Sequence, residues 1–351
     1  MDTGILAAAV SPLCAWHKAH KKHYPWRESR DPYRIWISEV MLQQTRTGAV
    51  LPYYERFLSA FPSVKALSEA EDDILMKHWE GLGYYSRARN LKKGAIAVME
   101  RFGGALPRTK AELRTIPGIG DYTAGAIASM AFFEPASAVD GNVLRVCMRL
   151  LGSDADISKE KTKKELAAAL DEIYPTGESA ALFTEGLMEL GEAVCIPGGE
   201  ARCALCPLSD ICLARAGGIT HLLPAKSPKK PRRILPRTLF LFRCGGRYGI
   251  RKRPPTGLLA SLYEFFAEDG EMTQDEVMLY LRKEGFQIKS VTPVGEATHI
   301  FTHLEWRMRG YLVELSAPAP GLIYATKEEL TGVYALPSAF RYYKKFIESR
   351  D

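Results

Sequence analysis

Four cysteines near the middle of the chain restrict its fold more than any other feature. Cys195, Cys203, Cys206 and Cys212 follow the pattern C-x7-C-x2-C-x5-C, with no histidine among them. Four thiolates at such short spacing are typical of a zinc or a [4Fe–4S] centre. A disulfide framework is the alternative, but the remaining cysteines are few and scattered, unlike those of a small secreted domain. The spacing therefore predicts a metal centre and leaves zinc and iron–sulfur open.

Length, charge and hydropathy narrow the class of protein. A chain of 351 residues is long enough for two domains with separate cores. The net charge of +6 favours an anionic partner without identifying it as nucleic acid. The apolar stretch from Ile5 to Trp16 follows no basic region and is interrupted by Ser11 and Pro12, which predicts a first helix instead of a leader peptide. No stretch has the length of a membrane span, and we expect an intracellular protein whose thiols stay reduced.

The hydrophobic pattern changes at a basic, proline-rich stretch, residues 221–236, which predicts an extended linker. One interpretation of this linker is a solvated spacer, and the other is a spacer that also contacts phosphate. Before it, helical periodicity covers Pro32–Ser59, Ala70–Trp79, Tyr85–Arg101 and Lys159–Ile173. After it, alternation predicts strands at Thr238–Phe242, Tyr248–Lys252, Gln287–Pro293, His299–Phe301 and Glu305–Glu314, with a helix at Thr273–Lys283 capped by Thr273 and Glu276. A helical region and an α+β module are therefore expected.

A Pro-Gly-Ile-Gly turn at residues 117–120 joins a short helix to one rich in small residues. Gly118 and Gly120 let the backbone turn tightly and let a phosphate approach the N–H groups that begin the next helix. Such a helix-hairpin-helix holds the DNA backbone without reading its sequence. An ordinary turn between helices is the alternative; the segment Val139-Asp140-Gly141-Asn142, farther along the chain, favours the DNA-binding interpretation.

Two carboxylates have the sequence contexts of an acid–base pair. Glu39 is flanked by apolar residues, and a partly buried carboxyl keeps its proton to a higher pH. Asp140 follows an apolar run at a turn, where it caps the next helix and can also point into a cleft. A protonated and an ionised carboxyl together can break a glycosidic bond, one as the acid and the other as the partner of a cationic sugar.

Several longer motifs join these features, and with them the chain resembles the helix-hairpin-helix DNA glycosylases that carry an iron–sulfur cluster, specifically the adenine DNA glycosylases of the MutY family. The matching segments are Pro25-Trp26-Arg27, Trp36–Thr45 (WISEVMLQQT), Gly81–Leu91 (GLGYYSRARNL), the hairpin, Val139–Asn142 and the cysteine cluster. The resemblance covers nearly the whole chain. It implies a mainly α N-terminal helix-hairpin-helix domain with a [4Fe–4S] cluster loop, and an α+β MutT/Nudix-like C-terminal domain.

The resemblance also implies the domain limits. Residues 1–220 form the catalytic region, with a helix-hairpin-helix barrel at about 30–135 and an iron–sulfur domain built from 1–29 and 136–220. Residues 221–236 form the linker, and residues 237–351 form a MutT-like domain that recognises the lesion. The four cysteines would hold the cluster, which would have a structural role.

Site roles follow from the same resemblance. Glu39 would protonate the adenine leaving group and then activate water, and Asp140 would support the sugar intermediate with help from Tyr122 and Asn142. The adenine pocket would contain Trp26, Arg27 and Glu185; Gln44, Thr45, Leu82 and Tyr84 would enter the duplex; Phe301, Thr302 and His303 would read 8-oxoguanine. Ordinary packing is the alternative for Trp26, Tyr84 and Phe301, and a solvated position for Gln44 and His303.

Position 122 separates two kinds of chemistry. In the related glycosylase/lyases a lysine stands there, whereas Tyr122 offers no amine, so base excision without efficient strand cleavage is expected. The C-terminal module lacks the carboxylate-rich helix of Nudix hydrolases: Tyr263 stands six residues after Gly257, where a glutamate is needed. Pyrophosphate hydrolysis is therefore not expected.

The sequence departs from the family pattern at three places. The first cysteine gap is x7 instead of x6, and its loop has only Arg202, with Glu200, as charged candidates for DNA contact. Thr302 stands where serine is common, which keeps the hydroxyl. The segment Gly257–Leu262 replaces a more glycine-rich turn.

The predicted substrate is duplex DNA with adenine opposite 8-oxoguanine or guanine, bound by a monomer that can also meet other repair or replication proteins. The expected location is the bacterial cytoplasm at the nucleoid, or the nucleus or mitochondrion of a eukaryote. Two rival functions remain: a glycosylase/lyase for oxidised pyrimidines, and a catalytically inert iron–sulfur protein that binds DNA.

Overall fold

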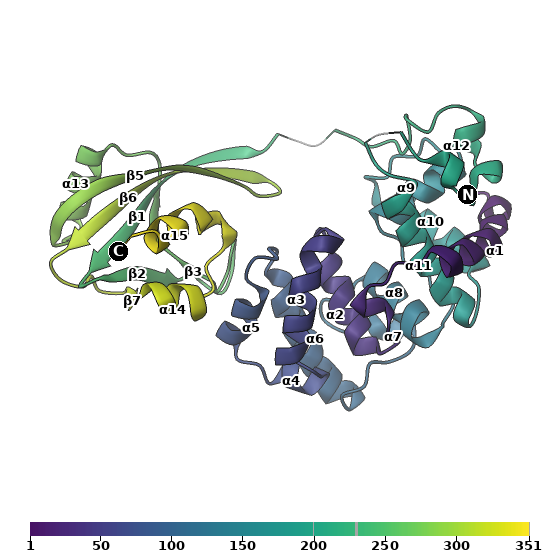
Figure 1. Cartoon of the computed structure of the whole chain (residues 1–351), viewed down its shortest axis with the longest axis horizontal. Coiled ribbons are helices and arrows are strands. Elements are labelled where there is room, and N and C mark those ends of the chain that lie inside the picture. Colours follow the sequence, from purple (N-terminus) through teal and green to yellow (C-terminus); the bar gives the residue numbers. More distant parts are fainter. Residues whose placement is uncertain (199, 229–230, 351) are drawn as a thin grey trace. The chain divides into compact units, whose positions relative to one another are not determined.

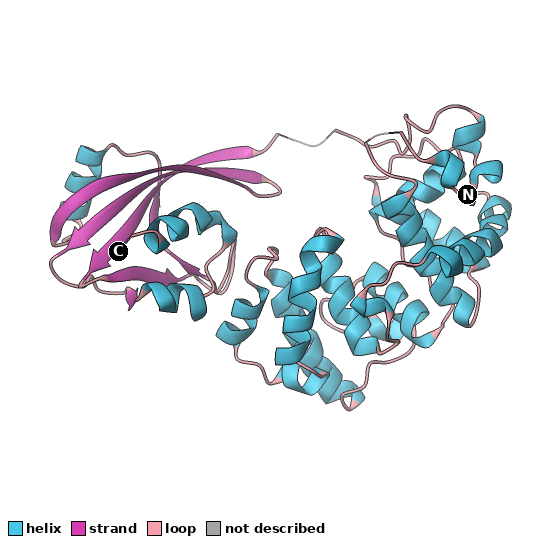
Figure 2. Ribbon diagram, in the orientation of Figure 1, coloured by secondary structure: helices cyan, strands magenta, loops and turns pink. Residues whose placement is uncertain are grey.

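A computed structural model describes residues 1–198, 200–228 and 231–350 (Figure 1). The chain forms two compact units, one of residues 1–69 with 90–228 and the other of residues 70–89 with 229–351. Strands are confined to the second unit within the described residues, as Figure 2 shows. The predicted combination of a helical N-terminal region and a sheet-containing C-terminal domain is confirmed. Among the described residues, no helix combines the length and apolar character that crossing a membrane requires.

The first unit is helical and carries the cavity described below. Its elements are α1 (Thr3–His20), η1 (Pro25–Arg27), α2 (Pro32–Leu42), α3 (Thr47–Ala60), α4 (Val64–Ser68), most of α6 (Ser86–Phe102), α7 (Lys110–Leu113), α8 (Asp121–Phe132), α9 (Gly141–Leu150), α10 (Glu160–Ile173), α11 (Glu178–Ala193), η2 (Cys203–Leu205), η3 (Ser209–Ile211) and α12 (Leu213–Ala216). Helices α1, α9, α10 and α11 share one core that includes Leu13, Met148, Leu166 and Leu190.

The helical window predicted for Pro32–Ser59 is two helices instead of one. Helix α2 ends at Leu42, and Gln44 has a φ of 56°, which an α-helix does not contain. The break places a loop at the end of α2, whose residues from Ile35 to Met41 are all buried. Loop residues and buried helix residues can therefore line the same cavity.

Close packing fixes helix α8 beside the segment that leads to Asp140. A Cβ atom at Gly125 would lie 1.9 Å from the carbonyl oxygen of Ser137, so only glycine permits this approach. The segment Ala136–Val139 is buried, and Asp140 at its end is the N-cap of α9 as predicted. Helix α8 and the start of α9 are thereby held side by side.

The second unit is a mixed sheet with helices on both faces. Its strands are β1 (Arg233–Cys244), β2 (Arg247–Lys252), β3 (Tyr263–Glu264), β4 (Phe266–Asp269), β5 (Ile288–Ile300), β6 (Leu304–Leu315) and β7 (Ile323–Ala325), in the order β3-β2-β1-β6-β5 with β4 on β1 and β7 on β2. Its helices are α5 (Asp72–Trp79), α13 (Gln274–Lys283), α14 (Lys327–Gly332), η4 (Ser338–Phe340) and α15 (Arg341–Glu348). Along β1, Leu239 and Leu241 join a core with α14 and α15, whereas Phe240 and Phe242 join a core with α13.

The described residues at both ends of the predicted linker are hydrogen-bonded to other parts of the chain. Strand β1 begins at Arg233, inside the predicted linker, because it pairs in parallel with β6 from Leu304 onward. At the other end, Arg149 Nε donates to the Leu223 carbonyl at 2.8 Å, and Ile157 N donates to the Ala225 carbonyl at 3.0 Å. The predicted capping box of α13, Thr273 with Glu276, is present.

Candidate active site

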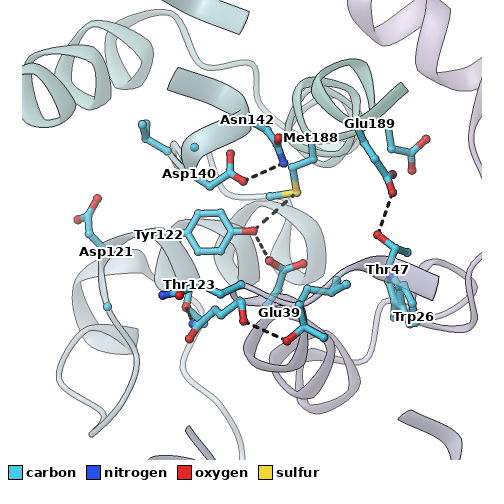
Figure 3. Close-up of a pocket in the computed structure, with 18 of the residues that line it drawn as sticks. Trp26, Glu39, Thr47, Asp121, Tyr122, Thr123, Asp140, Asn142, Met188 and Glu189 are labelled. Carbon is cyan, nitrogen blue, oxygen red and sulfur yellow. Dashed lines mark hydrogen bonds between the residues drawn. The ribbon is translucent and has the colours of Figure 1, made fainter. Parts of the chain in front are cut away.

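A cavity of about 690 Å³ in the first unit gathers most of the predicted catalytic residues. It is lined by residues of η1, α2, the loop after α2, the hairpin before α8, the start of α9, and α11 (Figure 3). The predicted residues that it brings together are Trp26, Arg27, Glu39, Gln44, Thr45, Gly118, Gly120, Tyr122, Asp140 and Asn142. Segments far apart in the sequence therefore meet around one space.

Glu39 has the environment of a carboxylic acid that retains its proton. It is only 1% exposed, and the Tyr122 hydroxyl donates to its Oε2 at 2.5 Å. Its Oε1 is buried and accepts no hydrogen bond from the described residues. Burial raises the pKa of Glu39; Arg27 and the Tyr122 hydrogen bond oppose this, and the charge of Asp140 adds to it. Glu39 thus lines the cavity with one carboxyl oxygen that has no hydrogen-bond partner among the described residues.

Asp140 faces the same cavity in a more polar setting. Its Oδ1 accepts from Val143 N at 2.8 Å, and its Oδ2 accepts from Asn142 Nδ2 at 3.2 Å (Figure 3). Burial raises the pKa of Asp140, whereas these hydrogen bonds and the charge of Arg145 lower it. Asp140 thus accepts two hydrogen bonds where Glu39 accepts one, and it both caps α9 and lines the cavity.

Tyr122 lies beside Glu39 as a neutral hydroxyl. Burial and the Glu39 carboxyl raise its pKa well above the usual tyrosine value. It follows the turn in which Gly118 has a φ of 82° and a Cβ would lie 2.6 Å from Asn90 Cβ, so glycine is required there. The hairpin thus presents a hydrogen-bond donor, and no amine, at this position.

Arg27 lines the cavity, whereas Glu185 lies behind its wall. Arg27 lines the cavity, and its Nη1 lies 2.9 Å from the Met130 sulfur. Glu185 is buried but does not line the cavity; its Oε1 accepts from Arg30 Nη1 at 2.5 Å. Glu189, one turn farther along α11, lines the cavity instead.

Of the residues predicted to enter the duplex or to read 8-oxoguanine, Gln44 and Thr45 line the cavity of the first unit, and the others belong to the second unit. Tyr84 is 47% exposed, has a φ of 45°, and its hydroxyl lies 3.0 Å from Thr302 Oγ1. Phe301 packs edge-on against Trp306 in the hairpin between β5 and β6, and His303 is at its exposed end. Leu82 is buried. The loop before α6 and this hairpin are therefore in contact.

Part of the cavity wall consists of residues that were not predicted from the sequence. Residues that line it without having been predicted are Tyr24, Leu42, Gln43, Thr47, Asp121, Thr123, Val139, Gly141, Lys163, Met188, Glu189 and Glu192. Many of them are next to predicted residues in the sequence, and this proximity could have indicated that they line the cavity. For Lys163, Met188 and Glu189 the sequence shows only an ordinary amphipathic helix.

The four clustered cysteines line a second, small cavity of about 30 Å³ together with Arg149. All are free, and Arg149 Nη1 donates to Cys195 Sγ at 3.3 Å. In the described part of the chain, no three Cys, His, Asp or Glu side chains are grouped so as to hold one metal ion. The thiols surround a space instead. Gly199, in the loop with the extra residue, lies outside the described residues.

One arginine joins the cysteine loop to the catalytic segment. Arg145 Nε donates to the Cys195 carbonyl at 2.7 Å, and its Nη2 donates to Asn142 Oδ1 at 2.9 Å and to the Gly191 carbonyl at 2.8 Å. Asn142 in turn donates to Asp140. A chain of hydrogen bonds thus links the Asp140 carboxylate to the backbone of the cysteine loop.

The fold and this cavity define a DNA glycosylase of the helix-hairpin-helix class. Residues 37–172 match the model of the HhH-GPD superfamily base excision DNA repair protein, and residues 238–345 match the NUDIX domain. A solved thermostable thymine-DNA glycosylase is similar at a TM-score of 0.55 and 28% identity, covering 60% of this chain and 96% of that one. Endonuclease III in a non-covalent DNA complex has the same fold, with a TM-score of 0.52 and 24% identity over 62% of this chain and 99% of that one.

Curated relatives give the particular family. The adenine DNA glycosylase of Mus musculus is 32% identical over 98% of this chain and 79% of its own length. That of Homo sapiens is 30% identical over 98% and 75%, and that of Buchnera aphidicola subsp. Baizongia pistaciae 32% over 82% and 81%. The chain belongs to the adenine DNA glycosylase family, as the resemblance predicted.

Proposed function

We propose that this DNA glycosylase removes adenine paired with 8-oxoguanine, and more weakly adenine paired with guanine, by hydrolysing the N-glycosidic bond in duplex DNA. The observation that carries the proposal is that Glu39 and Asp140 line one cavity in different electrostatic environments. The cavity volume of about 690 Å³ is sufficient for a flipped nucleotide.

The proposed chemistry divides the two charges that form when the bond breaks. Glu39 donates its proton to the departing adenine, and Asp140 stabilises the positive charge on the sugar. Water then bonds to the sugar carbon and gives a proton back to Glu39, so that free adenine and an abasic site are formed. Tyr122 and Asn142 hold the two carboxyls through the hydrogen bonds described above.

Strand cleavage is not part of the proposal, because Tyr122 has no amine with which to attack the sugar. Lys163, on α10, also lines the cavity and carries an amine. Direct nicking by the purified protein would therefore implicate Lys163 and contradict the monofunctional assignment.

The second unit is proposed to recognise the base opposite adenine. Tyr84 is exposed and joined to Thr302, so a stacking ring and a hydroxyl are held together at one surface. Phe301 packs on Trp306 and anchors the hairpin that carries Thr302 and His303.

The cysteines are proposed to hold a [4Fe–4S] cluster. The donor set fits, because four free thiols surround one space and thiolates are the usual ligands of such clusters. Cys195, Cys203, Cys206 and Cys212 would hold it and would thereby be fixed relative to one another. Arg145 connects this loop to Asn142 by hydrogen bonds. The role of the cluster is structural, since hydrolysis transfers no net electrons.

Cysteine replacement tests this centre. Cys206→Ser is expected to lower bound iron and acid-labile sulfide and to reduce the melting temperature, because metal-site binding energy contributes to folding. Cys244→Ser, at a half-buried free cysteine of the second unit, is the matched control and should keep the iron of the parent protein. Equal iron in both variants would exclude Cys206 as a ligand.

A single duplex assay tests the function. With one 8-oxoguanine:adenine pair, we expect cleavage at the adenine only after alkali treatment, and slower reaction with guanine:adenine. Direct nicking would support a glycosylase/lyase, and binding without cleavage would support an inert DNA-binding protein. Binding should weaken as salt is raised, because phosphate contacts release counterions.

The proposed substrate also implies an oligomeric state, a location in the cell and partners. It would act as a monomer on DNA, at the nucleoid of a bacterium or in the nucleus or mitochondrion of a eukaryote. Other repair or replication proteins remain proposed partners.

A further inference from the structure

A buried charge cluster lies behind the adenine cavity and includes a histidine to which the chemistry above gives no role. His17 on α1 is 1% exposed, and neither ring nitrogen has a hydrogen-bond partner among the described residues. Its Nε2 lies 3.5 Å from Glu185 Oε2 and 3.7 Å from Glu189 Oε1. A buried imidazole without hydrogen bonds lowers the stability of the folded state.

Packing holds His17 at this place. A Cβ at Gly186, on α11, would lie 3.4 Å from His17 Cβ and 3.0 Å from Leu13 Cγ, so α1 rests directly on α11. Glu185 and Glu189 are one turn apart on that helix. The imidazole therefore faces two carboxylates carried by the helix on which α1 packs.

Glu189 lies between His17 and Arg27 and is hydrogen-bonded to neither. Its Oε1 is 3.7 Å from His17 Nε2 and 3.8 Å from Arg27 Nε, and all three atoms are buried without a hydrogen bond from the described residues. Its Oε2 accepts from Lys22 N at 3.3 Å, which fixes the other end of the carboxylate. A small rotation completes a bond to one partner and withdraws Glu189 from the other.

Arg27 is the partner that a ligand can reach. It lines the cavity, and its hydrogen bonds run to the sulfurs of Met130 and Met188, which are weak acceptors. Burial would lower the pKa of Arg27, but Glu185, Glu39 and Glu189 raise it, so the guanidinium stays charged. A base entering the cavity can offer it better acceptors than thioethers.

We propose that His17 is a positioning residue, which takes over Glu189 when Arg27 turns to the extruded adenine. Without the imidazole, Arg27 would remain as the ion-pair partner of Glu189 within the described residues, and Glu189 would hold it away from the base. The inference rests on the proposed function, because it concerns binding of the adenine that the enzyme removes. It adds a residue from α1, outside the cavity wall, to the recognition of the base.

The test compares two uncleavable duplexes. One carries 2′-fluoro-2′-deoxyadenosine opposite 8-oxoguanine, and the other a tetrahydrofuran abasic analogue at the same position. His17→Phe is expected to weaken binding of the adenine duplex about tenfold and to leave binding of the abasic duplex unchanged, since one charge-assisted hydrogen bond is lost. Single-turnover excision should fall by a similar factor. Equal losses on both duplexes, or no loss on either, would overturn the inference.

Two further variants separate positioning from packing. His17→Gln keeps an N–H donor and should retain most of the affinity for the adenine duplex. Glu189→Gln in the His17→Phe background should restore part of it, because a neutral amide holds Arg27 less strongly. An impaired His17→Gln, or a double variant no better than His17→Phe, would contradict the role of His17.

If His17→Phe does not fold, pH decides the question in the parent protein. The groups facing His17 are Glu185 and Glu189 from α11, Arg27 and Arg30 from the segment after α1, and Lys21 at the end of α1. Burial lowers the pKa of His17, so the imidazolium gains population only on acidification. Titration of Glu39 contributes to the pH dependence of both proteins. The preference for the adenine duplex over the abasic duplex should therefore rise more steeply from about pH 8 to about pH 6 in the parent than in Glu189→Gln; equal slopes would reject the inference. Excision by the parent protein reports separately on the proposed function.

Discussion

Glutamine at position 39 is expected to reduce adenine excision about 10³- to 10⁴-fold while leaving binding of the mismatched duplex nearly unchanged. The amide has the size of the acid and can still accept from Tyr122, but it cannot give a proton to adenine. Single-turnover excision and duplex affinity, measured on the same preparations, separate the two effects. Retained excision would remove Glu39 from the mechanism.

The same replacement should make the protein more stable at neutral and higher pH. Burial raises the pKa of Glu39 in the folded state, so the unfolded chain loses this proton first and the native state loses stability as pH rises toward the folded pKa. Glutamine removes this cost, and we expect a gain of about 1 kcal/mol. In the parent protein, excision should decline over the same rise in pH, because the acid form of Glu39 is being lost.

Asparagine at position 140 is expected to lower the excision rate about 10²- to 10³-fold. The charge that stabilises the sugar cation disappears, whereas the side-chain oxygen can still accept from Val143 N and cap α9. Stability should therefore remain close to that of the parent protein, as judged by thermal melting.

Alanine at the same position is the matched control for the cap. Asp140→Ala removes both the charge and the cap and should cost about 1 kcal/mol of folding free energy in addition to the loss of activity. If Asp140→Asn kept the parent rate, the carboxylate would serve only the helix, and the acid–base pair would be refuted.

The sequence predicted the fold where local signals were strong. The Pro-Gly-Ile-Gly turn, the cap at Asp140 and the strands β1, β2 and β6 all have local signatures. Strand β5 is one continuous strand, Ile288–Ile300, where the sequence predicted two, at Gln287–Pro293 and His299–Phe301. The short strands β3 and β7 have no local signature, because two or three residues show no alternation. The grouping of residues 70–89 with the C-terminal unit also has no local signal, since it depends on contacts such as that of Tyr263 with Asp73.

The candidate site was predictable in its motifs and less so in its geometry. Glu39 and Asp140 stand in unusual local contexts, so their sequence neighbours indicated them. Whether Glu185 or Glu189 reaches the cavity depends on how α11 is rotated, which tertiary packing sets. The helical periodicity around Gln44 likewise did not predict its left-handed φ, because the spacing of apolar residues carries no information about a single backbone angle.

The crystal structure of the protein on a duplex with 2′-fluoro-2′-deoxyadenosine opposite 8-oxoguanine tests the account most directly. We expect the adenine inside the 690 Å³ cavity, with the free Oε1 of Glu39 within hydrogen-bond distance of a ring nitrogen and the Asp140 carboxylate against the sugar. An adenine bound elsewhere, or one that reaches only one of these carboxyls, would contradict it.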